Sequence, residues 1–509
     1  MFRPQTLLTQ PNLLLGPGNR QDSVLVQLQR HWIVEAIRYT HPEAVEHILS
    51  DGTGATDVNF PTVSRLPTQR TEHYNLDPLL ENEGTVTGTY NVIEQIFSRQ
   101  LGFGPDKHTN PLHLVYGDQK TVSLIHSVQR ERAVATQSYD KYDWVLPVPG
   151  LFHWRTNLLE MIYDVYFGPG GTESQTTLNY QRAFLNNIIG DRSPFQQKEE
   201  LAMRSFDARV TAAYYSFLPR RINKSHKEEV DVYMKRSGRV AFLHQVDRIR
   251  EALFTIPAQR SPLESSPAAE NFDYEYCNHA KFLQQMELYK TLKQAIKRAD
   301  IGLIKRTFPR CALLFHGSKK RNYADLSCYM TWLTQTDAAD VVLQDAVLAN
   351  GLVNLRGQSD SWFEMDRLNE FFNLQMKNLM SARRTSSIDI HTLFQQTALS
   401  ANYCTDLSEA MENVFGESPN PRHHNKNVTH DVRNLAFELS RSGSMVKNDT
   451  KRLDQQPDDI HRRGTNTIFD LVKRFNKRVV YKMLEEDDNN DYTTTNITQI
   501  ENHTGPDDG

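Results

Sequence analysis

Cysteine is scarce in this chain of 509 residues, and no long apolar run interrupts it. The four cysteines (Cys277, Cys311, Cys328 and Cys404) lie far apart and form no CxxC pair. That spacing argues against a structural zinc site and against a dense disulfide framework, and it favours a reducing compartment. No apolar run is long enough to span a bilayer, and the first residues do not form a signal peptide. We therefore expect a soluble, intracellular protein without a membrane partner.

The rest of the composition is that of an ordinary globular protein. Hydrophobic residues make up 39% and aromatic residues 10% of the chain, which excludes a largely disordered protein. The length allows two or three domains with cores of their own. The net charge of −4 indicates no overall preference for a polyanion, so any such preference must lie in local patches. The chain contains no internal repeat.

The first informative stretch is His113–Thr121, a short apolar run that ends in Gly117-Asp118 and is followed by a helical pattern. We expect a strand over 113–116 with Asp118 at its end. A carboxylate at the end of a strand lies at the rim of a sheet, where metals and substrates bind. The alternative is a strand closed by an ordinary aspartate turn.

A second apolar run, 144–148, leads through Pro149-Gly150 into a helix expected at 157–167. His153 lies at the start of this helix, where the helix dipole favours a neutral imidazole. Two interpretations stay open for His153: a ligand, or a packed histidine of the core. We expect strands 113–116 and 144–148 to lie in one sheet.

The segment 363–377 combines two helical faces. Asp366, Glu370, Asn373 and Lys377 fall at i, i+4, i+7 and i+11 and so form one stripe of a helix. Like charges at i and i+4 repel, at a cost of about 0.2–0.5 kcal/mol, unless a cation or a buried partner lies between them. A solvated polar stripe is the alternative. The apolar side chains of this helix are expected to pack against the sheet, and these are Phe363, Leu368 and Phe371 or Phe372.

Basic residues are concentrated between 290 and 321, where Asp300 is the one acid. They are Lys290, Lys293, Lys297, Arg298, Lys305, Arg306, Arg310, Lys319, Lys320 and Arg321. A basic face of that density suits a phosphate backbone. A solvated helix face is the alternative.

Helical periodicity marks most of the remaining chain. Further helices are expected over 30–48 with a break at Pro42, and over 91–101, 326–333, 341–353, 406–415, 430–439 and 465–484. The residues from 485 onward have the composition of a disordered tail.

Four motifs in this order resemble a transposon-derived family with a ribonuclease H-like transposase core, whose members are mostly uncharacterised proteins of fungi and some animals. They are Gly117-Asp118-Gln119 with Thr121, Pro-Val-Pro-Gly-Leu-Phe-His153, Arg321-Asn322-Tyr323-Ala324, and Asp366 with Glu370, Asn373 and Lys377. The resemblance spans roughly residues 75 to 480.

The resemblance implies an α/β fold in which a mixed sheet carries flanking helices. The segments it implies are a mostly helical N-terminal region (1–105), the first half of the core (106–171), a helical, basic insertion (172–315), the second half of the core (316–400), a helical C-terminal region (401–484) and a disordered acidic tail (485–509).

The resemblance also implies a Mg²⁺ or Mn²⁺ site that cuts and joins DNA. Asp118, Glu370 and Asp366 are then the metal ligands, and His153 joins them as a catalytic residue. Related cores often carry an acid where this chain has Leu151, so either His153 replaces that ligand or the site is incomplete.

DNA is the expected partner, which implies a nuclear location, and an oligomer is possible. The residues expected to hold the DNA backbone are Lys120, Arg155, Lys290, Lys297, Arg298, Lys305, Arg306, Lys319, Lys320 and Arg321. Two alternatives remain: a domesticated or decayed relative that binds nucleic acid or acts as a scaffold without catalysis, and an unrelated helical interaction protein.

Overall fold

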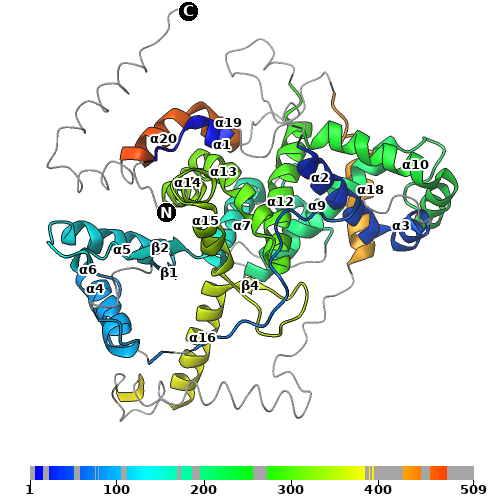
Figure 1. Cartoon of the computed structure of the whole chain (residues 1–509). Coiled ribbons are helices and arrows are strands. Elements are labelled where there is room, and N and C mark those ends of the chain that lie inside the picture. Colours follow the sequence, from blue (N-terminus) through cyan, green and yellow to red (C-terminus); the bar gives the residue numbers. More distant parts are fainter. Residues whose placement is uncertain are drawn as a thin grey trace, which may run out of the picture.

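The computed structural model describes most of the chain, and it is mostly helical (Figure 1). The described residues are 6–14, 22–50, 58–104 except 75 and 78, 112–168, 174–185, 195–255, 272–383, 389, 392–394, 428–448 and 459–477. The helix expected at 406–415 and the tail expected at 485–509 lie outside these residues. Within them, no helix has the length and apolar character that crossing a membrane requires.

The helices follow one another along the chain with few strands between them. They are α1 (Gln10–Leu14), α2 (Ser23–Thr40), α3 (Pro42–Leu49), α4 (Val86–Glu94), the π-helix η2 (Gln95–Gln100), α5 (Gln119–Arg132), α6 (Ser138–Lys141), α7 (Leu151–Phe167), α8 (Leu178–Arg182), α9 (Phe195–Phe217), α10 (Lys227–Leu253), α12 (Tyr274–Arg298), α13 (Ile301–Gly317), α14 (Arg321–Gln335), α15 (Val341–Ala349), α16 (Met365–Arg383), α18 (Thr429–Arg441), α19 (Ile460–Asn466) and α20 (Ile468–Phe475).

The expected ribonuclease H-like core with a central mixed sheet is wrong. The described residues form two separate sheets of two strands each. In the first, β1 (His113–Gly117) and β2 (Val145–Pro149) run parallel, so the two strands expected in one sheet do pair. In the second, β3 (Leu352–Val353) and β4 (Phe363–Glu364) run antiparallel. Helices, rather than a sheet, therefore carry the core.

Helix α12 lies in the middle of that core, with α7, α9, α10 and α13 packed around it (Figure 1). It is buried along almost its whole length although it carries many polar residues. Its buried cations are paired: Lys281 with Asp459 at 2.8 Å and Lys290 with Asp207 at 3.3 Å. The stretch that the sequence marks as a polar, helical insertion is thus central, because partners elsewhere in the chain neutralise its charges.

The β1–β2 pair has an apolar core on each face. Leu146 and Val148 point into the large helical core, whereas Val145 points into a small core formed with α4 and α5. Successive side chains of a strand face opposite sides, so a short apolar run serves both cores. The two strands are packed on both faces, which sets the position of the edge where Gly117 and Pro149 end them.

Several local predictions are confirmed. Pro42 ends one helix and occupies the first turn of the next, where its missing N–H costs no hydrogen bond. Helix α16 contacts β1, β3 and β4, and Leu368 is buried.

Two local predictions differ from the structure. Phe371 remains 45% exposed, so it does not supply the expected contact with the sheet. The helix expected over 341–353 ends at Ala349, and the rest of that segment turns into β3.

Candidate functional site

Asp118 lies directly after β1 and begins α5. Its Oδ1 accepts a hydrogen bond of 2.8 Å from the backbone N–H of Thr121, which makes it the N-cap of that helix. The backbone N–H of Gly150 donates to the carbonyl of Gly117 at 2.8 Å and so joins the ends of the two strands. Because parallel strands end at the same edge, Asp118 and the start of α7 lie at one rim.

Asp366 binds the start of α7 from the opposite side. The backbone N–H of Phe152 donates to both carboxylate oxygens at 3.0 Å, and that of His153 donates to Oδ2 at 3.2 Å. The positive end of a helix favours such an anion. A Cβ atom at Gly150 would lie 2.3 Å from Asp366 Oδ2, so a side chain there would displace the carboxylate. Gly150 is needed for this close approach.

His153 stands between the two acids of α16. Its Nδ1 lies 3.2 Å from Asp366 Oδ2, and its Nε2 lies 3.5 Å from Glu370 Oε1. The hydrogen bond with Asp366 raises the pKa of His153, and the charges of Asp366, Glu370 and Asp118 act in the same direction, against partial burial. The partner expected to relieve the i, i+4 repulsion in α16 is therefore this histidine. The pKa of His153 is thus shifted in the direction opposite to that expected at the start of a helix, because the three carboxylates outweigh the helix dipole.

The other motif residues lie at different distances from this cluster. Tyr323, in the first turn of α14, is half-buried. Its pKa is raised mainly by this burial and further by the charge of Asp118. Asn322 is exposed beside it in the same turn, and Gln119 opens α5. Asn373 and Lys377 are exposed farther along α16. Gln119 follows Asp118 directly, and α14, which carries Asn322 and Tyr323, contacts α5.

Residues 7–424 match a family described as a family of unknown function (DUF6589). The chain belongs to this family. No curated protein and no solved structure matches the chain. The family match therefore assigns no reaction to the chain.

Arg155 lies inside the protein and not on a surface that DNA could contact. It is buried, its Nε donates to Glu364 Oε1 at 2.6 Å, and its Nη1 donates to the hydroxyl of Tyr289 at 2.9 Å. A buried, paired guanidinium cannot reach a phosphate backbone, so the expectation for Arg155 is wrong. An arginine within the apolar pattern of α7 indicates a buried cation, and a buried cation needs an acidic partner. That partner is Glu364, which the sequence pattern alone does not connect to Arg155.

The expected basic face of 290–321 is largely used inside the protein. Lys290 is buried against Asp207, and Arg306 and Arg310 pair at 2.8 Å with Asp22 and Glu287. The expectation of DNA contact is wrong for Lys290, which is buried and paired. Arg306 and Arg310 are partly exposed beside their carboxylate partners, and DNA contact by Arg306 stays a prediction.

The other expected nucleic-acid residues differ in exposure. The guanidinium of Arg298 donates to the carbonyl of Phe60. The side chains that remain exposed or half-exposed are Lys120, Lys297, Lys305, Lys319, Lys320 and Arg321. They are spread over α5, α12, α13, the connection between α13 and α14, and the first residue of α14, so they do not form one helix face.

The carboxylates of the cluster differ in how accessible they are to a cation. As they stand, no three His, Cys, Asp or Glu side chains of the described stretches are grouped closely enough to hold a metal ion. Asp118 is exposed and Glu370 has a side chain 45% exposed, so both carboxylates are accessible. Mg²⁺ binds through one or two carboxylates and keeps several waters, so these two oxygen donors suit it. Asp366, with its hydrogen bonds to α7, is the positioning residue.

Proposed function

We propose that this protein is transposase-derived and carries a site for Mg²⁺- or Mn²⁺-dependent cleavage or transfer of DNA strands, with DNA in the nucleus as its partner. The observation that supports it is the place of His153 between Asp366 and Glu370, at the rim where Asp118 ends β1. His153 and Asp366 are 213 positions apart in the chain. Polar groups that come together at an accessible rim from such distant parts of the chain are more typical of a reactive site than of a local turn.

Each residue has a separate role in this proposal. Asp118 and Glu370 would hold the cation, which when bound polarises the phosphodiester and activates water. Asp366 fixes the start of α7 and the ring of His153 through its hydrogen bonds. The hydrogen bond with Asp366 and the nearby carboxylates raise the pKa of His153 and so favour a proton on its ring, which suits the role of general acid for the leaving oxygen.

Thermal melts with and without Mn²⁺ test the proposal. At a hundredfold excess over the dissociation constant, a cation that binds the folded state stabilises it by about 2.7 kcal/mol. Asp118→Asn should abolish this stabilisation and also the nicking of supercoiled DNA. The control is Glu131→Gln, which removes an exposed carboxylate from the far end of α5. A wild-type protein that shows neither a Mn²⁺-dependent rise nor nicking would overturn the proposal.

A non-catalytic relative is the second candidate, and one observation favours it. The carboxylate of Asp366 is already occupied by the N–H groups of α7 and by His153. Such a protein would bind nucleic acid equally well in EDTA and in Mn²⁺, and Asp118→Asn would leave both that binding and the melting curve unchanged.

A further inference from the structure

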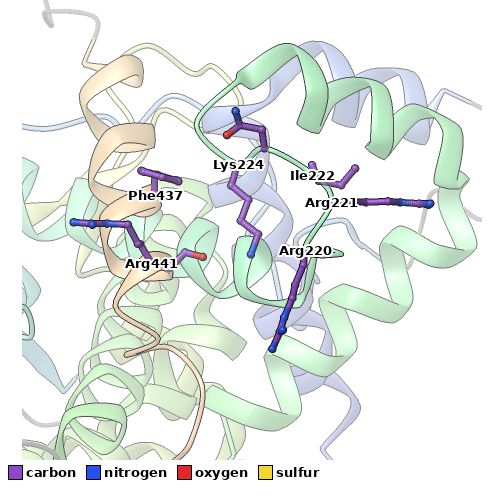
Figure 2. A pocket seen from close by; sticks show the side chains of 8 residues that line it. Arg220, Arg221, Ile222, Lys224, Phe437 and Arg441 are labelled. Atoms are coloured by element: carbon purple, nitrogen blue, oxygen red, sulfur yellow. The ribbon is translucent and has the colours of Figure 1, made fainter.

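A pocket with a volume of about 420 Å³ lies between the α9–α10 connection and the last turns of α18 (Figure 2). One wall is the loop from Arg220 to Lys224, and the other is formed by Phe437, Ser440 and Arg441 of α18. In Figure 2, the side chain of Lys224 runs from the loop into the space between the walls. The pocket is distant in the sequence from every residue of the cluster around His153.

The charge of this pocket is not neutralised from within. Within the described residues, Arg220, Arg221 and Lys224 have no carboxylate within ion-pair distance, while Arg441 shares Glu438 at 2.7 Å. Burial lowers the pKa of Lys224, and the charge of Arg220 lowers it further. The basic residues of α12 and α13 differ, because most of them have an internal acid. A bound anion would relieve the repulsion that this pocket retains.

The shape of the pocket is set before any ligand binds. The N–H of Ile222 donates to the carbonyl of Pro219 at 3.1 Å, and the side chain of Asn223 accepts from the N–H of Ser225 at 3.2 Å. The carboxylate of Glu229 accepts a hydrogen bond of 3.1 Å from the backbone N–H of Asn223, so this acid binds the loop backbone. The loop therefore holds its cations without closing the pocket, and little ordering is needed on binding.

The mixture of groups selects the kind of anion. Arginine and lysine together bind phosphate oxygens, arginine as a planar fork and lysine as a point charge. Phe437 and Ile222 add an apolar surface beside these cations, which suits a sugar or the face of a base. A free inorganic anion makes no use of that apolar surface.

We propose that this pocket binds the phosphate backbone of a nucleic acid strand. The choice of a nucleic acid over a free phosphate rests on the proposed function, whereas the anion site itself does not. The pocket makes backbone contacts that position the strand and carry no sequence information.

The test is the binding of a fluorescent oligonucleotide, single-stranded and double-stranded, to the full chain in EDTA at several salt concentrations. The variant is Arg220→Gln/Lys224→Gln. The matched control is Lys473→Gln/Lys477→Gln, which removes two exposed positive charges from α20 and the residues just after it. Both variants change surface side chains, and their melting curves verify the fold.

We expect the pocket variant to bind about tenfold more weakly, a loss of about 1.4 kcal/mol. The slope of its affinity against salt should fall by about 0.9 for each duplex phosphate that the variant no longer neutralises. The control should bind like the wild type. An unchanged affinity in the pocket variant, or an equal weakening in the control, would overturn the proposal. So would a pocket that binds pyrophosphate while the oligonucleotide affinity stays unchanged, since the site would then serve free phosphate.

This experiment is independent of the metal chemistry. Because binding is measured in EDTA, a protein without cleavage activity gives the same result if the pocket exists. Asp118→Asn should bind the oligonucleotide like the wild type. A wild-type protein that binds the oligonucleotide through the pocket but nicks no DNA therefore counts against the proposed function alone. A wild-type protein that nicks DNA, while its pocket variant binds with unchanged affinity, counts against the pocket alone.

Discussion

Gly150→Ala isolates the interaction on which the candidate site depends. The backbone of Gly150 has φ −68° and ψ 140°, which any residue adopts, so the substitution brings no backbone strain. Its one consequence is the new methyl group, which would lie 2.3 Å from Asp366 Oδ2. The carboxylate must move away from the start of α7, and its hydrogen bonds to the backbone N–H groups of Phe152 and His153 are broken.

The magnitude follows from those bonds. Losing a side-chain cap costs about 0.5–2 kcal/mol. Losing an anion at the positive end of a helix costs a further 0.3–1 kcal/mol, roughly. We therefore expect Gly150→Ala to lower the free energy of unfolding by about 2 kcal/mol. The pKa of His153 should fall, because the hydrogen bond that raises it is broken.

A double-mutant cycle in urea separates this explanation from ordinary crowding. Asp366→Ala alone should cost about the same 2 kcal/mol, since it removes the same bonds. In the Asp366→Ala background, Gly150→Ala should have almost no further effect, because no carboxylate remains to be displaced. The urea midpoint of each variant gives the free energies. If Gly150→Ala costs equally in both backgrounds, the interaction with Asp366 is not the cause.

Two further predictions concern charges in this region. The contribution of His153 to stability is fully present below its unfolded pKa of about 6.5 and is lost as the pH rises through its raised folded pKa. His153→Gln should therefore remove that pH dependence, as urea unfolding at a series of pH values would show; an unchanged dependence would place it on another group. Arg155→Met should cost about 3–5 kcal/mol because it leaves Glu364 buried and unpaired. Arg155→Met/Glu364→Met should cost much less, and urea unfolding that gives equal costs would exclude a buried ion pair of this strength.

The sequence predicted the local parts of the candidate site for physical reasons. The apolar runs at 113–116 and 144–148 are short, and each ends in a turn, which is typical of parallel strands with a common edge. The stripe that carries Asp366 and Glu370 follows from the 3.6-residue period alone. That His153 shares a site with these residues was implied only by the resemblance, and the structure places its ring nitrogens 3.2 Å from Asp366 Oδ2 and 3.5 Å from Glu370 Oε1.

The fold class could not be predicted in the same way, because it depends on contacts between distant residues. Lysines at 281 and 290 make α12 look like a surface helix, whereas Asp459 and Asp207 neutralise them inside the core. Those partners lie 178 and 83 positions away (459 minus 281, and 290 minus 207), and no local pattern connects them. For the same reason, the run 290–321 resembled a DNA-binding face, because its acidic partners lie elsewhere in the chain.

Leu151 bears on the choice between an enzyme and a non-catalytic relative. Its side chain is buried in the large helical core, so an acid at this position would have to leave water for an apolar environment. On this backbone, the position therefore does not face the rim, and its lack of an acid removes no ligand from Asp118 or Glu370. The residue that does face the rim from the same turn is His153, whose side chain is 33% exposed. Asp118 and Glu370 are the accessible carboxylates at this rim, and Mg²⁺ characteristically binds through one or two carboxylates and keeps several waters. Under the proposed function, Glu370 exchanges His153 for the cation, so Glu370→Gln should abolish the Mn²⁺-dependent stabilisation as Asp118→Asn does.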